Sequence, residues 1–157
     1  MANSLLTAHG ELLDDTQSFR PVLLDLLTDA DLRFALPGNM TLGELCREMG
    51  ETEHGYVASF TRFEHEWGYR HPDAAVTTDL AALEAWYGEL DRQLGAALSA
   101  LTEEQIAEHR VRGGGWASLE KELHLYREAL LIFYAKAGVY LRALGKPLPE
   151  AWLDWMG

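Results

Sequence analysis

The residues of this chain that could do chemistry are histidines, carboxylates and a single cysteine. Glu51 and His54 form a Glu-x-x-His step, half of the pattern that di-iron helical bundles use twice. The sequence contains no second copy of this step. On a helix that turns about 100° per residue, His54 falls opposite the apolar stripe and Glu51 falls well off it. We therefore expect both side chains to be exposed to solvent, and we expect no di-iron site.

Helical phase also sorts the other histidines. His9 lies on the apolar stripe of the first predicted helix, where a hydrogen-bonded core or edge histidine is expected rather than a ligand. His124 and Glu128 lie away from the stripe of the last helix and are predicted to be solvated surface groups. The remaining histidines fall in loops or near helix ends with no shared spacing: His65, His71 and His109.

The common motifs for metal and nucleophile sites are missing from the sequence. Neither an HExxH motif nor a Cys/His zinc pattern occurs. Cys46 flanks a buried helix face with no histidine near it in sequence or phase, so we expect an inert thiol. Residues 113–115 are glycines, but they follow no strand and lack the Lys-Ser/Thr ending of a phosphate-binding loop.

Glu48 differs from the other carboxylates. It sits about 70° from the centre of its helix stripe, and Glu122 and Ala129 flank the stripe of the last helix to a similar degree. Side chains at such angles can reach a groove between two helices. The simpler expectation is that Glu48 pairs with a basic residue such as Lys136.

Amphipathic helices must position these groups. The longest signal runs from Trp116 to Gly145, where apolar residues recur at alternating steps of three and four and Ser118 can cap the start. The first helix covers about Leu5 to Thr28, and Pro21 is predicted to kink it or to lie in the first turn of a new helix. Residues 29–40 are predicted to be a connection.

The second helix opens at a capping box formed by Thr41 and Glu44 and runs to about Glu66. The linker Trp67–Thr77 has no helical period, and its 11 residues at ~3.3 Å each reach about 36 Å, the length of a ~24-residue helix. A third helix, from residue 77 or 78 to Leu101, can therefore run parallel to the second. A short helix follows to about residue 109, and no strand pattern occurs.

Composition limits the classes of protein. The 157 residues, 48% of them hydrophobic, suit a single domain over residues 1–157. The longest apolar run is far shorter than the ~20 residues of a membrane span, and the first 13 residues do not resemble a signal peptide, so we expect a cytoplasmic protein. One cysteine excludes an internal disulfide. A net charge of -12 repels phosphate backbones, so no nucleic-acid partner is expected.

Four heptad-like helices of about 20 to 28 residues predict an all-α four-helix bundle. Residues 130–134 are apolar on nearly every side of their helix, which favours either a central position or a second buried face at a homodimer interface. The tryptophans are predicted to be packing anchors, the last two pinning the C-terminal tail: Trp67, Trp86, Trp116, Trp152 and Trp155.

Two stretches of the sequence resemble a known family. Residues 37–60, PGNMTLGELCREMGETEHGYVASF, resemble the start of the second helix in the DinB/YfiT-like superfamily of bacterial four-helix bundles. Residues 136–150, KAGVYLRALGKPLPE, resemble the stretch that closes that fold. The resemblance covers nearly the whole chain. It implies an up-down-down-up bundle with the Trp67–Thr77 linker as the crossover, and members of the superfamily are often dimers.

Many members of this superfamily hold a divalent metal with one histidine from the second helix and two, four apart, from the last. They include thiol transferases and predicted metal-dependent hydrolases. Matching the flanking residues places these ligands at Glu48, Ala129 and Phe133, none of which is histidine. The resemblance therefore implies a member whose metal site is lost, and we expect no cofactor.

The sequence favours a DinB-like dimer of unknown specific activity, stress-associated or binding a small apolar or thiol-bearing molecule. The predicted groove between the second and last helices is lined by Glu48, Thr52, Tyr126, Ala129 and Phe133. The alternative is a metal-dependent hydrolase or thiol transferase, with Zn, Ni or Fe in a rearranged site built from Glu48, Glu122 and His9. A stress-linked interaction protein without a pocket is a third class, which the sequence does not separate from the first.

Overall fold

A computed structural model describes residues 2–113 and 115–156, with side chains described as far as residue 153. The described chain is mostly helical, which confirms the predicted helical class in outline. No described helix is both long and apolar enough to cross a bilayer. The elements are α1 (Ser4–Gln17), α2 (Phe19–Leu24), α3 (Asp29–Leu32), α4 (Leu42–Arg62), the 3-10 helix η1 (Ala74–Thr77), α5 (Leu80–Ala100), α6 (Glu103–Glu108), β1 (Arg110–Arg112), β2 (Trp116–Ser118), α7 (Leu119–Ala143) and α8 (Glu150–Met156).

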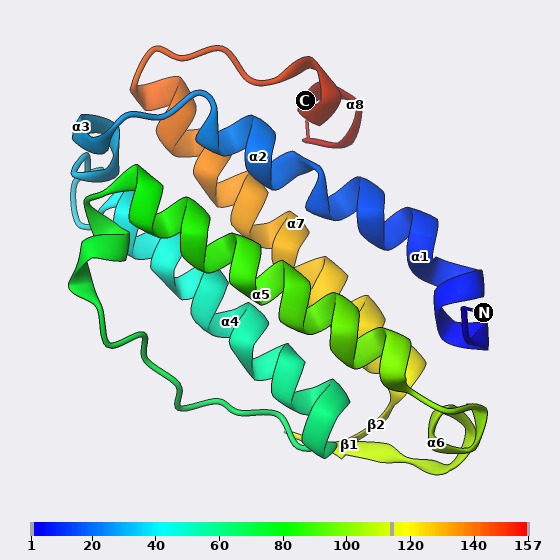
Figure 1. Ribbon diagram of the computed structural model, residues 1–157. Helices are drawn as coiled ribbons and strands as arrows, with labels where there is room; N and C mark the ends of the chain where they lie inside the picture. The colour runs from blue at the N-terminus through cyan, green and yellow to red at the C-terminus, as the bar shows by residue number, and fades with distance from the viewer. Residues whose placement is uncertain (1, 114, 157) are drawn as a thin grey trace.

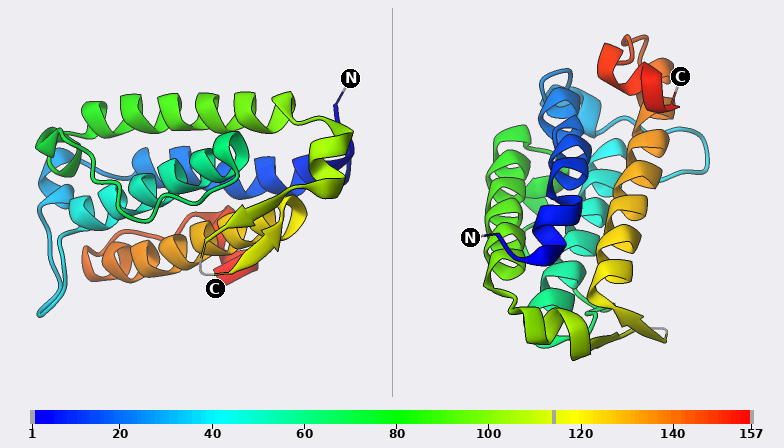
Figure 2. Two further views of the ribbon diagram at one scale, coloured as in Figure 1. Left: turned by 90° about the horizontal axis from the view of Figure 1, so that it is seen from below. Right: turned by 90° about the vertical axis from the view of Figure 1, so that its right-hand side faces the viewer.

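The α1–α2 segment and the long helices α4, α5 and α7 lie side by side along most of their length (Figures 1 and 2). Figure 1 shows that α4 and α5 both run from the α3 end of the molecule towards the β1–β2 end, whereas α1 and α7 run the other way. The chain must therefore return between α4 and α5, and residues 63–79 pass back alongside α4 (Figure 1). We call residues 63–79 the crossover.

Local signals in the sequence set most of the helix starts. Thr41 and Glu44 form the predicted capping box, and the Ser118 side chain accepts from the backbone N–H of Lys121 at the start of α7. Pro21 lies in the first turn of α2, a new helix that begins after Ser18. This is the second of the two predicted alternatives for Pro21.

The structure corrects three details of the predicted elements. Residues 110–112 and 116–118 form a two-stranded antiparallel sheet, so Trp116 lies in β2 and not in the last helix. Strands of three residues are too short to show an alternating pattern. Residues 29–32 form α3 behind a capping box within the predicted connection. Helix α4 ends at Arg62, because Phe63 adopts the left-handed conformation with φ 56°.

The left-handed Phe63 turns the chain into an edge contact with β1. The Phe63 carbonyl accepts from the N–H of Arg112 at 3.0 Å, and the N–H of His65 donates to the Arg112 carbonyl at 2.8 Å. The start of the crossover is thus held at the β1–β2 end. At its other end, a Cβ on Gly43 would overlap the backbone of Thr77, so only glycine allows η1 to lie this close to α4.

The predicted tryptophan anchors differ in burial, and Trp86 is partly buried against the core. Trp152 is fully buried, with ring centroids 6.2 Å from Phe19 and 5.4 Å from Tyr134, so it pins α8 onto α2 and α7. Trp155 falls outside the described side chains. Trp67 and Trp116 are 69% and 71% exposed, contrary to the expectation of packing anchors.

A buried ion pair joins α2 to α4. Arg20 is 2% exposed and Glu53 is 0% exposed, and the two side chains are in direct contact. The Arg20 guanidinium also lies 3.2 Å from Asp91 of α5 and 4.4 Å from the Tyr87 ring centroid. Burial raises the pKa of the Glu53 carboxyl to about 7, although the charge of Arg20 acts in the opposite direction.

We expect Arg20→Met to lower the free energy of unfolding by about 3–5 kcal/mol, because it leaves Glu53 buried without its countercharge. The double variant Arg20→Met/Glu53→Leu should recover most of this loss. Urea denaturation measures both changes. Arg92→Met, which breaks an exposed pair with Glu89, is the matched control and should leave the free energy of unfolding close to that of the wild type, because solvent screens exposed pairs. Equal costs for the Arg20 and Arg92 variants would contradict the prediction.

Candidate ligand-binding groove

A groove of about 370 Å³ lies between α4 and α7, and the crossover forms its outer wall. Three segments distant in the sequence therefore contribute to it. The residues that line it are Glu48, Glu51, Thr52, Tyr56, His65, Glu66, Trp67, Tyr69, Arg70, Ala129, Ile132 and Phe133.

Four of the five residues predicted to line a groove do border it: Glu48, Thr52, Ala129 and Phe133. Tyr126 differs, because it is 0% exposed and lies outside the lining. Its ring centroid is 5.2 Å from that of Tyr56, which does border the groove. Tyr126 lies seven residues before Phe133 and therefore on the same face of α7. Neighbouring side chains cover Tyr126 at its position along the helix.

Glu51 was predicted to be exposed, and the structure overturns this. Glu51 is 7% exposed because the crossover covers its face of α4. Its carboxylate accepts from the backbone N–H of His71 at 3.0 Å and lies 3.3 Å from Arg70 Nη1 and 3.5 Å from Arg47 Nε. These partners compensate the charge of Glu51 within the fold.

The predicted exposure of His54 is also corrected. Its side chain is 28% exposed, and its ring stacks on Tyr69 of the crossover with centroids 3.6 Å apart. Burial lowers the pKa of His54. Glu66 lies 3.6 Å from His54 Nε2 and accepts from Arg62 at 2.6 Å. The Glu51–His54 step thus serves to attach the crossover to α4.

Glu48 borders the groove and keeps a free acceptor. Its Oε2 atom is buried and has no hydrogen-bond partner among the described residues. The suggested partner Lys136 instead places its Nζ 5.3 Å from the Phe133 ring centroid. The groove therefore combines apolar and aromatic surface with one carboxylate that the fold leaves without a countercharge.

A buried polar cluster lies beside the groove, formed by Ser59, His65 and Glu122, each at most 8% exposed. The Ser59 hydroxyl donates to Glu122 Oε1 at 2.7 Å and lies 3.0 Å from His65 Nδ1, which is 3.4 Å from the same Glu122 oxygen. Because the Ser59 hydroxyl is fully buried and already donates to Glu122, this arrangement does not present a nucleophile. It ties the crossover to α4 and α7.

Sequence reasoning placed His65 in a loop without a role. The one local signal was Gly55, because a Cβ there would approach within 2.8 Å of His65 Nε2. On the other side of His65, a second hollow of about 330 Å³ reaches β2 and the start of α7. Tyr56, His65 and Trp67 border both hollows and separate them.

The metal positions implied by the family resemblance do not fit a metal. Glu48, Ala129 and Phe133 border the same groove, but methyl and phenyl groups offer no donor atom. The rearranged set of Glu48, Glu122 and His9 is not brought together either. Glu122 belongs to the cluster with Ser59 and His65, whereas His9 pairs with a carboxylate of α7.

Cys46 is 1% exposed, and burial raises the pKa of its thiol to about 12, as expected for an inert thiol.

In comparisons with known proteins, no protein-family model matches the chain and no curated protein matches its sequence.

We expect Glu122→Leu to lower the free energy of unfolding by about 1–3 kcal/mol, because it removes the shared acceptor of Ser59 and His65 inside the protein. Glu122→Gln should cost less, since its amide oxygen still accepts from the Ser59 hydroxyl. Chemical denaturation gives the costs, and hydrogen exchange should show faster opening of the crossover in Glu122→Leu. Wild-type stability and exchange in that variant would show that the cluster does not hold the crossover.

Proposed function

We propose that this chain is a DinB-like four-helix bundle, a single domain over residues 1–157, whose α4–α7 groove binds a small molecule without a metal. The relative directions of α1, α4, α5 and α7, and the long crossover, support the up-down-down-up order that the resemblance implies (Figure 1). The loss of donor atoms at Ala129 and Phe133 supports binding without the metal typical of that superfamily.

The observation that carries this proposal is the free acceptor of Glu48, which borders a groove with several aromatic rings in its lining. A volume of about 370 Å³ is within the roughly 300–1,000 Å³ of small-molecule sites. Glu51 and Glu66 form ion pairs with arginines, whereas Glu48 Oε2 has no hydrogen-bond partner in the described part of the chain. A buried acceptor without a partner costs free energy, which a ligand that donates a hydrogen bond would recover.

The lining indicates the chemistry of the ligand. Rings of Tyr56, Trp67, Tyr69 and Phe133 border the groove, and aromatic faces favour flat apolar groups and cations. The ligand class is therefore a compact apolar molecule that carries one donor, an amine or a thiol, directed at Glu48. An anionic ligand of the same size would be repelled by the carboxylate.

We expect 2-phenylethylamine to bind the wild-type chain with a Kd of about 1 mM or lower, and 3-phenylpropionate, similar in size but anionic, not to bind. Glu48→Gln and Phe133→Ala should each weaken amine binding about tenfold or more. Titrations followed by NMR chemical-shift changes measure this. The exposed carboxylate variant Glu104→Gln should bind the amine as the wild type does.

Including 2-phenylethanethiol in the same titrations separates an amine site from a thiol site. Equal shifts in the wild type, Glu48→Gln and Phe133→Ala would contradict a groove site. A screen of all three probes without any saturable shift would favour the third class, a stress-linked interaction protein. The alternative of a hydrolase or thiol transferase with Glu48, Glu122 and His9 as ligands has no supporting contact among these residues.

The proposal includes a homodimer through α7. Leu125, Ile132 and Val139 repeat every seven residues and are 38%, 56% and 50% exposed, so they form an apolar line on one face of the helix. Leu130 and Tyr134 from the apolar 130–134 run are buried within the chain itself. A second copy packed on this line would also cover the mouth of the groove, because Ile132 borders it.

We expect the wild-type chain to sediment as a dimer and Val139→Glu to sediment as a monomer, because a charge on the apolar line must be desolvated in the interface. Val139 does not line the groove, so this variant should keep amine binding if the groove acts within one chain. Val22→Glu, which places a charge on an exposed apolar residue of α2, is the matched control and should remain dimeric. A monomeric wild type at micromolar concentration would contradict the dimer alone.

A further inference from the structure

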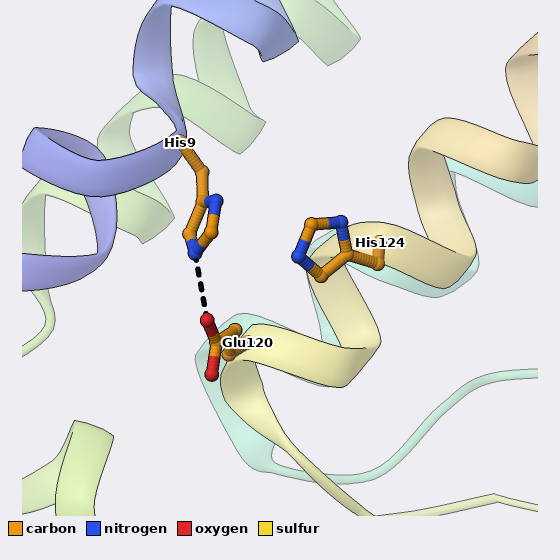
Figure 3. A group of neighbouring side chains, drawn as sticks. All are labelled: His9, Glu120 and His124. Atoms are coloured by element: carbon orange, nitrogen blue, oxygen red, sulfur yellow. Dashed lines mark hydrogen bonds and ion pairs between the residues drawn. The ribbon is translucent and has the colours of Figure 1, made fainter.

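A second group of side chains gathers where α1 faces the first turns of α7. His9 extends from α1, and Glu120 and His124 extend from α7 towards it (Figure 3). His9 Nε2 lies 2.8 Å from Glu120 Oε1, and the two imidazole centroids are 4.8 Å apart. One donor atom from each of the three residues lies within 4.8 Å of the other two.

Packed helices hold these residues in place. Glu120 and His124 are four residues apart, so they lie on one face of α7 one turn from each other. Along the same pair of helices, Arg127 Nε donates to Thr16 Oγ1 at 2.9 Å. Buried leucines fill the interior beside them: Leu5, Leu13 and Leu123. Because both backbones are helical and packed, the three side chains need only rotamer changes to adjust their distances.

We propose that His9, Glu120 and His124 bind one divalent transition-metal ion. Two imidazoles and a carboxylate suit Zn²⁺, Ni²⁺, Cu²⁺ or Co²⁺ better than Mg²⁺ or Ca²⁺, which prefer oxygen ligands. With bonds of about 2.0–2.2 Å, neighbouring donors in a tetrahedral site are about 3.3 Å apart. The observed range, from 2.8 Å to at most 4.8 Å, spans this distance.

His124 distinguishes this group from an ordinary surface ion pair. The ion pair between His9 and Glu120 does not involve His124. The His124 ring meets His9 edge to face, at an interplanar angle of 75°, and makes no hydrogen bond to a described residue. Its nitrogens are therefore available to a metal. Three protein ligands leave at least one coordination position for water, and the Glu120 side chain is 61% exposed.

This site is separate from the groove. His124 and Phe133 are nine residues apart on α7, which corresponds to a rotation of about 180° and a rise of about 14 Å. The groove lies between α7 and α4, whereas the histidine group lies between α7 and α1. The metal proposal therefore does not depend on the small-molecule proposal, and each can be tested without the other.

Calorimetric titration of tag-free, EDTA-dialysed protein with ZnCl₂ or NiCl₂ tests the proposal. We expect one saturable site per chain, and a thermal unfolding midpoint raised by about 5–10 °C at a hundredfold excess of metal over Kd. His9→Ala, His124→Ala and Glu120→Gln should each weaken binding about tenfold or more and lose most of the thermal shift. Circular dichroism verifies that these variants of partly exposed residues remain folded.

Two matched controls remove the same chemical groups elsewhere. His54→Ala deletes a histidine of α4, and Glu104→Gln neutralises an exposed carboxylate of α6. Both should bind metal with the wild-type stoichiometry and affinity. No saturable binding to the wild type, or equal binding by the wild type, His9→Ala and His124→Ala, would overturn the site. Binding of 2-phenylethylamine should be unchanged in His124→Ala, so the two proposals fail separately.

Discussion

The parallel course of α4 and α5 is the constraint on which the rest of this structure depends. Two parallel helices cannot be joined by a tight turn, so the chain must return over the length of α4 before α5 can begin. Residues 63–79 make that return against the outer face of α4. This face would otherwise be a solvated helix surface, and the crossover converts it into an interior.

Charged residues enclosed in this way have to find partners, because an isolated charge is costly to bury. The Glu51 carboxylate interacts with a backbone N–H and an arginine of the crossover. The Glu122 carboxylate accepts a hydrogen bond from Ser59 and lies close to His65. Each contact also fixes the crossover to the helices. The groove therefore has a wall attached at several points rather than a loose loop. Glu48 differs from these two residues, because its buried Oε2 atom has no hydrogen-bond partner among the described residues.

Helix α7 contributes to four different surfaces, and its periodicity explains how. The core stripe faces the other helices, Ala129 and Phe133 reach the groove beside α4, and Glu120 and His124 face α1. Leu125, Ile132 and Val139 remain on the outside. A helix of 25 residues presents all of these directions because successive residues are rotated by about 100°. Chemically distinct sites can thus share one rigid element.

Periodicity and capping residues determined the long helices from the sequence alone. The apolar stripes, Thr41 with Glu44, and Ser118 are local signals that act within one helix, and the structure contains the helices that they predict. Four groove residues were also foreseeable, since phase places Glu48 and Ala129 at the edges of facing stripes. The short strands had no such signal, because three residues do not establish a period.

Tertiary structure decided which polar residues are buried and which meet. Phase on a single helix separates core from non-core, but it does not say whether the non-core side faces water or another segment. Glu51 was assigned to solvent for this reason, yet it lies beneath the crossover. His124 was likewise set apart from the core correctly, but its neighbour is His9 of α1, 115 residues earlier in the chain. Contacts between distant segments depend on how helices pack, and no pattern within one helix contains that information.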